Sequence, residues 1–215
     1  MISADKVKFG AGIYGLYFAL ECAKRKEKVF VLEYNDGVFS RASFLNQSRI
    51  HNGYHYPRSL STALKSALYF ERFANSYPFC IQKKFKSIYS VAALNSKINK
   101  IQFENFANLP IYPFYKLRTV TSYSQINMRV MWKTVEYTYD AQRLKQYFLD
   151  ELIKYPNCSI HFNTRINSIK YEDKTFEIQY NSEEKIATEF VLNATYASTN
   201  QILETAGFSL FDVIY

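Results

Sequence analysis

One stretch, residues 6–33, constrains the fold of this chain more than any other; it reads KVKFGAGIYGLYFALECAKRKEKVFVLE. Gly10, Gly12 and Gly15 form a GxGxxG motif, and Glu33 follows the last glycine by 18 residues. The first glycine permits a tight turn, the second leaves room for a pyrophosphate, and the third lets a helix pack closely on a sheet. A pyrophosphate is favoured at the helix N-terminus, and Glu33 is placed to accept a ribose hydroxyl. The pattern therefore predicts a dinucleotide site.

The residues around the glycines predict a parallel β-α-β unit. The second strand, Val29 to Leu32, is a continuous apolar run, which is typical of a strand buried on both faces. The first strand carries Lys6 and Lys8 on either side of Val7, and we expect their stems to follow the sheet while their charged ends reach water. The helix between the strands shows an apolar stripe at i, i+3, i+4 and i+7, formed by Leu16, Ala19, Leu20 and Ala23.

The composition is that of a folded protein with room for one large domain or two small ones. The chain has 215 residues, of which 48% are hydrophobic and 21% charged. Its net charge is +8, but no nucleic-acid motif accompanies the lysine clusters, so we expect no nucleic-acid partner. The three cysteines form no metal-ligand pattern and favour a reducing, cytoplasmic location. The apolar segment 13–20 is too short to span a bilayer, so no membrane span is expected.

The connection after Glu33 is long and dense in polar side chains, and it reads YNDGVFSRASFLNQSRIHNGYHYPRS. Long connections in compact domains are usually functional or disordered, and the aromatic anchors favour order. Together with the glycine motif, this stretch resembles the FAD-dependent oxidoreductases of the D-amino-acid oxidase and glycine oxidase family. It is most similar to the branch that contains 2-hydroxyglutarate dehydrogenases. The positions that carry the resemblance are Arg41, Ala42, Ser43, Asn46, Arg49, His51, Gly53, Tyr54, His55, Tyr56 and Pro57.

The resemblance implies FAD as the cofactor, whereas the glycine motif alone leaves NAD open. It places Arg41 and Ser43 along the phosphates and ribitol of FAD, and Asn46, Arg49 and His51 near the flavin ring. Hydrogen-bond donors near the ring suit the negative charge of a reduced flavin.

The resemblance also gives the candidate catalytic residues, which are Arg49, His51 and Tyr54. The residues themselves leave a second interpretation open, because His51 and His55 are equally typical of partly buried histidines that are merely hydrogen-bonded. No metal site is expected.

The middle of the chain predicts a helix over 59–75, strands over 80–94, a short helix over 99–108 and strands over 120–139. The resemblance implies that residues 77–137 belong to an inserted, antiparallel, β-rich substrate domain. Arg118 and Arg129 are weak candidates there for holding a substrate carboxylate.

The last part of the chain predicts a helix capped by Asp140, then an antiparallel meander whose final strand run is 186–192. By resemblance Ile166 contacts the adenine, while Ala194 and Thr195 return to the pyrophosphate. Tyr196 stands where the family usually has glycine. The larger side chain is expected to close some space beside the cofactor.

The expected fold is α/β. It is a Rossmann-like FAD-binding domain, with the GxGxxG β-α-β unit plus an antiparallel meander, formed by residues 1–76 and 138–215 around the inserted domain.

Two functions follow from the resemblance. The first is an FAD-dependent oxidoreductase that oxidises a C–N or C–OH bond of a small amino or hydroxy acid by hydride transfer to flavin. The alternative is a non-catalytic dinucleotide-binding or partner-binding remnant. Family members normally continue for a further segment, so we expect a C-terminal part to be lacking, with self-association or a need for further polypeptide.

Overall fold

The computed structural model describes residues 2–84, 86–92, 94–109, 118–119 and 128–212, with the backbone alone at 118–119 and 128–131. The chain divides into two compact units. The first unit comprises Met1–Asn46 and Lys145–Tyr215, and the second comprises Gln47–Leu144. The predicted substrate segment, 77–137, falls inside the second unit, which also contains the residues from Gln47 onward.

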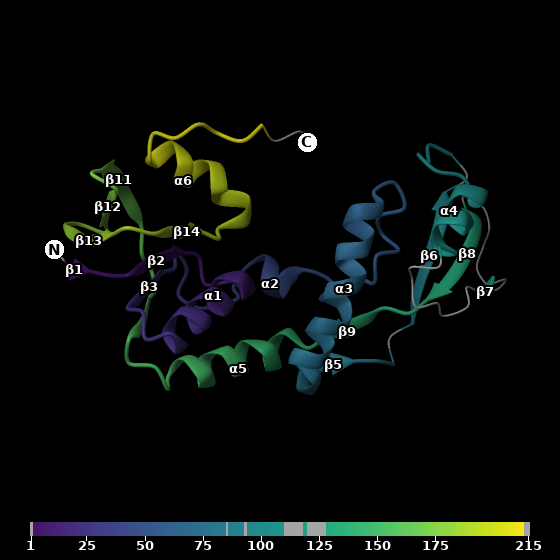
Figure 1. The fold of residues 1–215 in the computed structure, drawn as a ribbon, viewed down its shortest axis with the longest axis horizontal. Helices are drawn as coiled ribbons and strands as arrows, with labels where there is room; N and C mark the ends of the chain where they lie inside the picture. The colour runs from purple at the N-terminus through teal and green to yellow at the C-terminus, as the bar shows by residue number, and fades with distance from the viewer. Residues whose placement is uncertain (1, 85, 93, 110–117, 120–127, 213–215) are drawn as a thin grey trace. The chain divides into compact units, whose positions relative to one another are not determined.

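A parallel sheet forms the centre of the first unit (Figure 1). Its strand order is β10 (Cys158–His161), β3 (Val29–Leu32), β2 (Lys6–Phe9) and β14 (Val191–Asn193). Helix α1 (Ile13–Lys24) connects β2 to β3, and the four residues of its predicted apolar stripe are all buried. The β-α-β unit predicted from the glycine motif is therefore confirmed.

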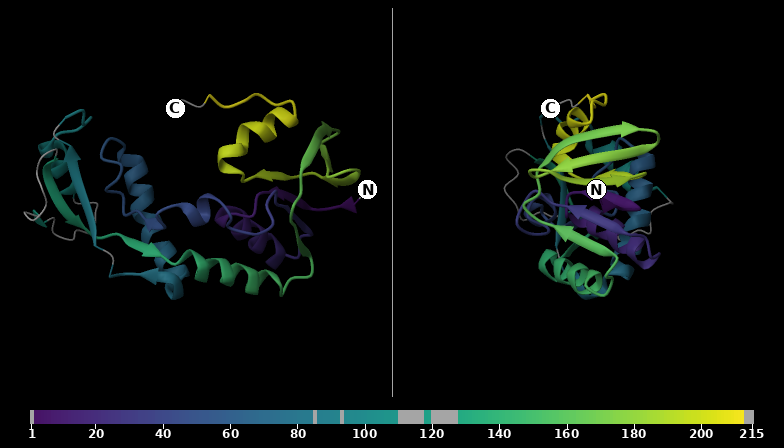
Figure 2. Two further views of the ribbon diagram at one scale, coloured as in Figure 1. Left: turned by 180° about the vertical axis from the view of Figure 1, so that it is seen from behind. Right: turned by 90° about the vertical axis from the view of Figure 1, so that its left-hand side faces the viewer.

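A second sheet of the first unit is the predicted meander, and its strands are visible in Figure 2 in green to yellow-green. Its order is β1 (Ile2–Ser3), β13 (Glu184–Thr188), β12 (Thr175–Tyr180) and β11 (Ile166–Glu172), with β11, β12 and β13 antiparallel. The apolar faces of the two sheets enclose one core, which contains Ala4, Val7, Phe9, Phe30, Leu32, Ile169, Ile178, Tyr180 and Ile186.

The chain changes sheets where the sequence predicts a single strand over 186–192, so that prediction is wrong. Strand β13 ends at Thr188, and β14 begins at Val191 in the parallel sheet. The Thr188 hydroxyl lies within hydrogen-bond distance of the carbonyl oxygens of Asp5 and Phe190, to which it donates. These contacts fix the bend of the chain between β13 and β14. The unit is completed by α2 (Ala42–Leu45), η2 (Tyr196–Ser198) and α6 (Thr199–Thr205).

The second unit contains two small antiparallel sheets. One has the order β4 (Arg49–Ile50), β9 (Tyr137–Tyr139) and β5 (Ile81–Gln82), and the other has β6 (Ser87–Ala92), β8 (Met128–Thr134) and β7 (Arg118–Thr119). Helices α3 (Leu60–Ser76) and α4 (Lys100–Ala107) and the short η1 (Pro78–Cys80) accompany them. A core forms around Trp132 with Tyr54, Val91, Phe103 and Ala107.

Local capping explains where two of the predicted helices begin. Asn99 and Gln102 form a reciprocal capping box at α4, and Asp140 Oδ1 accepts the N–H groups of Gln142 and Arg143 at α5 (Ala141–Leu152). Ser59 does precede α3 as predicted, but its hydroxyl contacts Thr62 Oγ1 at 2.8 Å and caps no backbone N–H.

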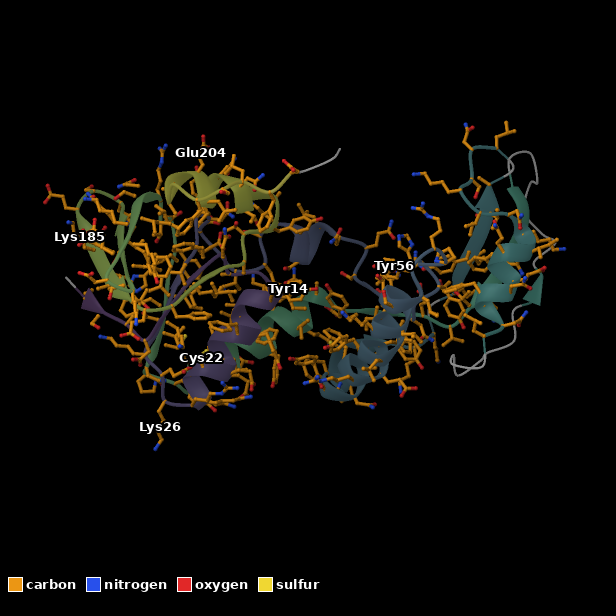
Figure 3. All side chains as sticks on the ribbon, turned by 45° about the horizontal axis from the view of Figure 1, so that its top comes forward. Tyr14, Cys22, Lys26, Tyr56, Lys185 and Glu204 are labelled. Carbon is orange, nitrogen blue, oxygen red and sulfur yellow. The ribbon has the colours of Figure 1, made fainter. Side chains whose placement is uncertain are left out.

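The surface carries many of the charged side chains, as Lys26, Lys185 and Glu204 illustrate (Figure 3). Within the described residues, no helix has both the length and the apolar character needed to cross a membrane.

Candidate functional site

The glycine turn of the first unit has the geometry that the motif predicts. Gly10 adopts a φ of +91°, which only glycine adopts without strain, and its N–H donates to Leu32 O at 2.9 Å. A Cβ on Gly10 would lie 3.0 Å from the carbonyl oxygen of Ala194, so the turn lies directly against the end of β14. Helix α1 starts at once, with Leu16 N–H donating to Gly12 O at 2.9 Å, and no acidic residue lies in its first turn. This helix N-terminus is electrostatically suited to an anion.

The carboxylate of Glu33 is bound to the turn in this structure. Glu33 is 7% exposed, and its Oε2 accepts the Ala11 N–H at 2.5 Å while Oε1 accepts both the backbone and the side-chain N–H of Asn35 at 2.9 Å. A carboxylate oxygen has a second lone pair, so this position is compatible with one further donor such as a ribose hydroxyl. An open hollow lies next to it, lined by Tyr34, Asn35, Asp36, Asn163 and Arg165.

Ser43 lies at the start of α1. Its hydroxyl oxygen accepts the Ile13 N–H at 2.9 Å, and a Cβ on Gly12 would lie 2.9 Å from the same oxygen. Arg41 is exposed, with its guanidinium 5.8 Å from the ring centre of Tyr34, and Asn46 is exposed as well.

The candidate residues from the C-terminal part of the chain lie in two places, beside the glycine turn and at the core between the two sheets. Ala194 N–H donates to Phe9 O at 3.1 Å, and the Thr195 hydroxyl donates to Asn193 Oδ1 at 2.6 Å, so both are fixed beside the glycine turn. Ile166 packs against the core between the sheets. Tyr196 has a φ of +55° and is 78% exposed. A left-handed backbone is one that glycine adopts most readily, so the conformation at Tyr196 is consistent with the glycine that the resemblance implies there.

Lys8 departs from its predicted behaviour. It is 0% exposed, and within the described structure its Nζ has no hydrogen-bond partner. Helix α1 covers it, and β3 and β14 flank its strand, so the side chain has no route to water. Burial lowers the pKa of Lys8 to about 7, although Glu33 and Cys158 favour the charged form. Lys6 does reach the surface, where it lies 3.9 Å from Glu27.

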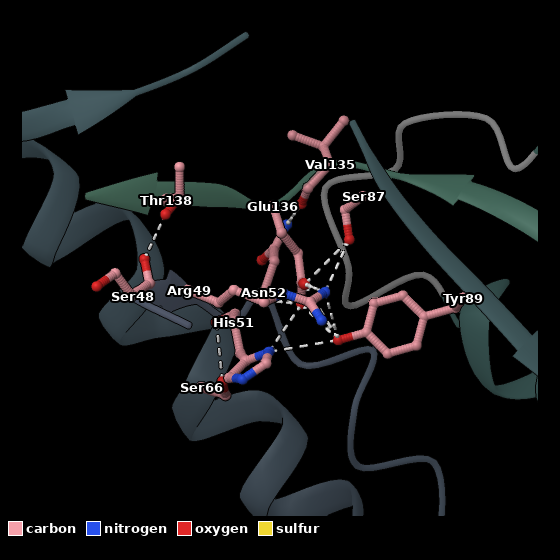
Figure 4. Close-up of polar contacts among 10 residues, drawn as sticks. All are labelled: Ser48, Arg49, His51, Asn52, Ser66, Ser87, Tyr89, Val135, Glu136 and Thr138. Atoms are coloured by element: carbon pink, nitrogen blue, oxygen red, sulfur yellow. Dashed lines mark hydrogen bonds and ion pairs between the residues drawn. The ribbon is translucent and has the colours of Figure 1, made fainter. Parts of the chain in front are cut away.

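A polar cluster around Glu136 occupies the second unit (Figure 4). The carboxylate is fully buried and accepts from Arg49 Nη2 at 2.5 Å, Tyr89 Oη at 3.0 Å, Ser87 Oγ at 3.2 Å and Asn52 N–H at 3.1 Å. His51 Nδ1 lies 3.3 Å from Oε1 of the same carboxylate. We name these six residues the Glu136 cluster.

The electrostatics of the Glu136 cluster favour an ionised carboxylate. Burial raises the pKa of Glu136, but the hydrogen bonds and charges of His51, Tyr89 and Arg49 outweigh it, so the net pKa lies below its usual value. Burial and the adjacent carboxylate raise the pKa of Tyr89, which therefore stays protonated and donates. Burial and the neighbouring His51 lower the pKa of His55, whose ring stacks on that of His51 at 5.1 Å.

The three predicted catalytic residues have different surroundings. The His51 side chain is 30% exposed and linked to Glu136, so it combines access with an acidic partner. The guanidinium of Arg49 is engaged by Glu136, Ser87 and Tyr89. Tyr54 is 1% exposed and lies in the core around Trp132.

Comparison with known proteins decides the family. The sequence profile of the DAO family, described as FAD dependent oxidoreductase, matches residues 9–213, which is nearly the whole chain. The chain belongs to the DAO family of FAD-dependent oxidoreductases. A fungal relative, "FAD-dependent monooxygenase FPY4" of Fusarium mangiferae, is 32% identical over 90 residues, covering 42% of this chain and 24% of the relative.

Solved structures share the fold. Glycine oxidase from Geobacillus kaustophilus superposes with a TM-score of 0.74 at 15% identity, covering 97% of this chain and 60% of that one. L-alpha-glycerophosphate oxidase from Mycoplasma pneumoniae, with FAD bound, gives a TM-score of 0.70 at 18% identity, covering 96% and 58%. The chain therefore spans well under two thirds of the length of these relatives. The predicted α/β FAD-binding fold is confirmed.

The described residues of the first unit fit the cofactor of the DAO family. A Cβ on Gly10 would meet Ala194, so the turn lies this close to the end of β14 only because Gly10 is a glycine. The first turn of α1 contains no acidic residue that would repel a phosphate. Glu33 with the adjoining hollow suits an adenosine.

Three features of these sites were not predicted from the sequence. Glu136 and Tyr89 were not among the sequence candidates, and the only local signal for Glu136 is its place between Val135 and Tyr137 in the strand-like run 128–139. Lys8 was expected to reach water, and the structure buries it instead. The side chains of Arg118 and Arg129 lie outside the described part of the chain.

Proposed function

We propose that this chain is the FAD-binding and substrate-oxidising part of an oxidoreductase that acts on a small amino or hydroxy acid. The observation that carries the proposal is the buried Glu136 carboxylate beside a partly exposed histidine, in a chain of the DAO family. Glycine oxidase and NikD, described as an unusual amino acid oxidase, are structural neighbours whose names support an amino acid substrate. The name of L-alpha-glycerophosphate oxidase, a third neighbour, supports oxidation of a small hydroxyl-bearing molecule. The 2-hydroxyglutarate dehydrogenase-like branch is our preferred assignment within the family, on the stretch from His51 to Tyr54.

In this proposal the first unit holds the adenosine diphosphate half of FAD. Gly10, Gly12 and the start of α1 bind the diphosphate, Ser43 accepts the N–H of Ile13 at the start of that helix, and Glu33 binds the ribose. The bound flavin supplies a hydride acceptor for the substrate carbon.

The second unit then provides a proton acceptor. In the tautomer that donates Nδ1–H to Glu136, His51 keeps a free lone pair on Nε2, and this nitrogen takes the proton of a substrate O–H or N–H group. The ionised carboxylate stabilises the imidazolium that forms. Arg49, Tyr89 and Ser87 hold that carboxylate in place, so Arg49 is a positioning residue that acts through Glu136. Tyr54 supports the same unit from its core.

The first test is FAD binding by the 215-residue chain. Oxidised flavin absorbs at about 450 nm, and its fluorescence changes on burial, so a titration gives stoichiometry and affinity. Anaerobic mixing of the loaded chain with a panel of small amino and hydroxy acids then shows whether the flavin band bleaches.

His51→Asn is the decisive variant, with His55→Asn as the matched control from the same ring stack. Loss of a general base is expected to slow bleaching by about 10²- to 10⁴-fold with FAD affinity unchanged, whereas the control should react within a few fold of the unchanged chain. Equal rates for both variants would refute the role of His51. Stoichiometric FAD with no bleaching by any acid would favour the non-catalytic alternative.

A further inference from the structure

The buried Lys8 has an electrostatic need that the described structure does not meet. Its side chain is 0% exposed, in a strand that pairs with β3 on one side and β14 on the other. No acceptor among the described residues binds its Nζ. An ammonium group in this position has lost its water without gaining a partner, which is unfavourable.

The amine lies directly against the glycine turn. The position that a Cβ of Gly15 would occupy is crowded by Nζ and Cε of Lys8 and by the carbonyl oxygen of Gly10. Gly10 opens the turn and Gly15 lies in the first turn of α1, so the amine touches the segment whose N–H groups and helix dipole favour an anion.

Among the described residues, two titratable groups face Lys8, and Lys8 is the member of this set whose protonation changes near neutral pH. They are Glu33, at the end of β3, and Cys158, in β10. The Glu33 carboxylate is already engaged by Ala11 and Asn35. Burial raises the pKa of Cys158 to about 11, so its thiol is neutral near pH 7. Burial lowers the pKa of Lys8 to about 7.

We propose that Lys8 couples binding of the FAD diphosphate at the glycine turn to the uptake of a proton. The inference rests on the proposed function, in which this turn holds the diphosphate. A nearby anion favours the protonated amine, so binding raises the pKa of Lys8. By linkage, the chain with protonated Lys8 binds the anion more tightly. The affinity for FAD is therefore highest at pH values below the pKa of Lys8 in the free chain. It falls as pH rises from that value to the higher pKa of Lys8 in the complex.

The test is an FAD titration of the 215-residue chain from about pH 6 to about pH 9. The diphosphate diester of FAD keeps its charge over this range, so a change in affinity reports the protein. We expect the affinity to fall about tenfold, which corresponds to about one pKa unit between the free and bound chain. Calorimetry in two buffers of different ionisation enthalpy should show net proton uptake on binding near pH 8.

Matched variants identify the group. Lys8→Met keeps a long unbranched side chain without the charge, and it should abolish both the pH dependence and the proton uptake. Lys6→Met removes the same formal charge from the same strand, but at the surface beside Glu27, and it should keep both effects. Cys158→Ser should also keep both, which separates the amine from the thiol that faces it.

The outcomes separate the two claims. Binding that is equally tight across the range, or a pH dependence and uptake that persist in Lys8→Met, would overturn the role of Lys8 and leave FAD binding intact. Absence of FAD binding at every pH would overturn the proposed function and this inference with it. If Lys8→Met does not fold, proton uptake by the unchanged chain decides, because its absence refutes the coupling.

Discussion

Replacing Glu136 by Gln should cause a large and local loss of stability. The substitution keeps the shape of the side chain but removes the charge, and it puts an amide donor where an oxygen now accepts. Arg49 Nη2 lies 2.5 Å from that carboxylate, and the Arg49 side chain is only 21% exposed, so its guanidinium loses a charged partner that little water can replace.

The size of the loss follows from this geometry. A hydrogen bond to a charged group contributes about 1.5 to 3 kcal/mol, and breaking a buried ion pair costs about 3 to 5 kcal/mol. Because Arg49 keeps partial access to solvent, we expect the free energy of unfolding to fall by about 2 to 4 kcal/mol. Glu104→Gln, which removes a partly exposed partner 3.9 Å from Lys100 in the same unit, should cost about 0.5 kcal/mol or less.

Trp132 makes the measurement specific to the second unit. It is the one tryptophan of the chain, it is 2% exposed, and its ring lies 4.6 Å from that of Phe103 in the core of this unit. Urea unfolding followed by tryptophan fluorescence therefore reports the unit that contains Glu136. A midpoint for Glu136→Gln equal to that of Glu104→Gln would refute the reasoning.

The pH dependence of this stability difference tests independently whether Glu136 is ionised in the folded chain. The net pKa of Glu136 is below the usual 4.5, so its stabilising contribution is complete above pH 4.5 and is lost as pH falls through the lower pKa of the folded chain. The difference between Glu136→Gln and the unchanged chain should therefore be constant near neutral pH and shrink in acid. A difference that grows in acid would contradict an ionised carboxylate.

Three further predictions concern the first unit. Glu33→Ala should weaken FAD binding by about 1 to 3 kcal/mol in a flavin titration, because a charged hydrogen-bond acceptor is lost, and an unchanged affinity would exclude the ribose contact. Gly12→Val should fold, since its Cβ meets only the movable hydroxyl of Ser43, yet it should not retain FAD on purification. Gly15→Ala should lose about 1 to 3 kcal/mol in thermal unfolding, and adding Lys8→Met should restore only part of it, because the carbonyl of the turn obstructs the same space. Full rescue would mean that the backbone can move.

The first unit was predictable because its signals are local. The glycine spacing, the apolar stripe of α1 and the run Val29–Leu32 lie within one short stretch, and each has a single structural interpretation. The strand over 186–192 was mispredicted because the change from one sheet to another at Thr188 leaves the hydrophobic pattern almost unbroken. The structure also corrects Lys8, because the same apolar strand neighbours and helix that predict the unit remove the path to water that a lysine needs.

The Glu136 cluster was only half predictable because its members are distant in sequence. Resemblance identified Arg49 and His51, but their carboxylate lies 87 and 85 residues further along the chain, and Ser87 and Tyr89 come from another strand. No local spacing encodes such contacts, and they depend on the pairing of β4 with β9 and of β6 with β8. What the sequence does contain is an acid between Val135 and Tyr137 in a run that otherwise predicts a strand.

Lys8 and Glu136 show two different ways in which a buried charge is tolerated in this chain. Glu136 accepts from Arg49, Ser87, Tyr89 and Asn52, so its charge is satisfied as soon as the second unit folds, and the histidine beside it is oriented before any substrate arrives. Lys8 has no hydrogen-bond partner in the described structure, so in the coupling proposed above its charged form is favoured when an anion binds at the glycine turn. Because a ligand stabilises whatever form it binds better, FAD should raise the melting temperature of the first unit more near pH 6 than near pH 9. The same reasoning predicts no such difference in the transition that Trp132 reports.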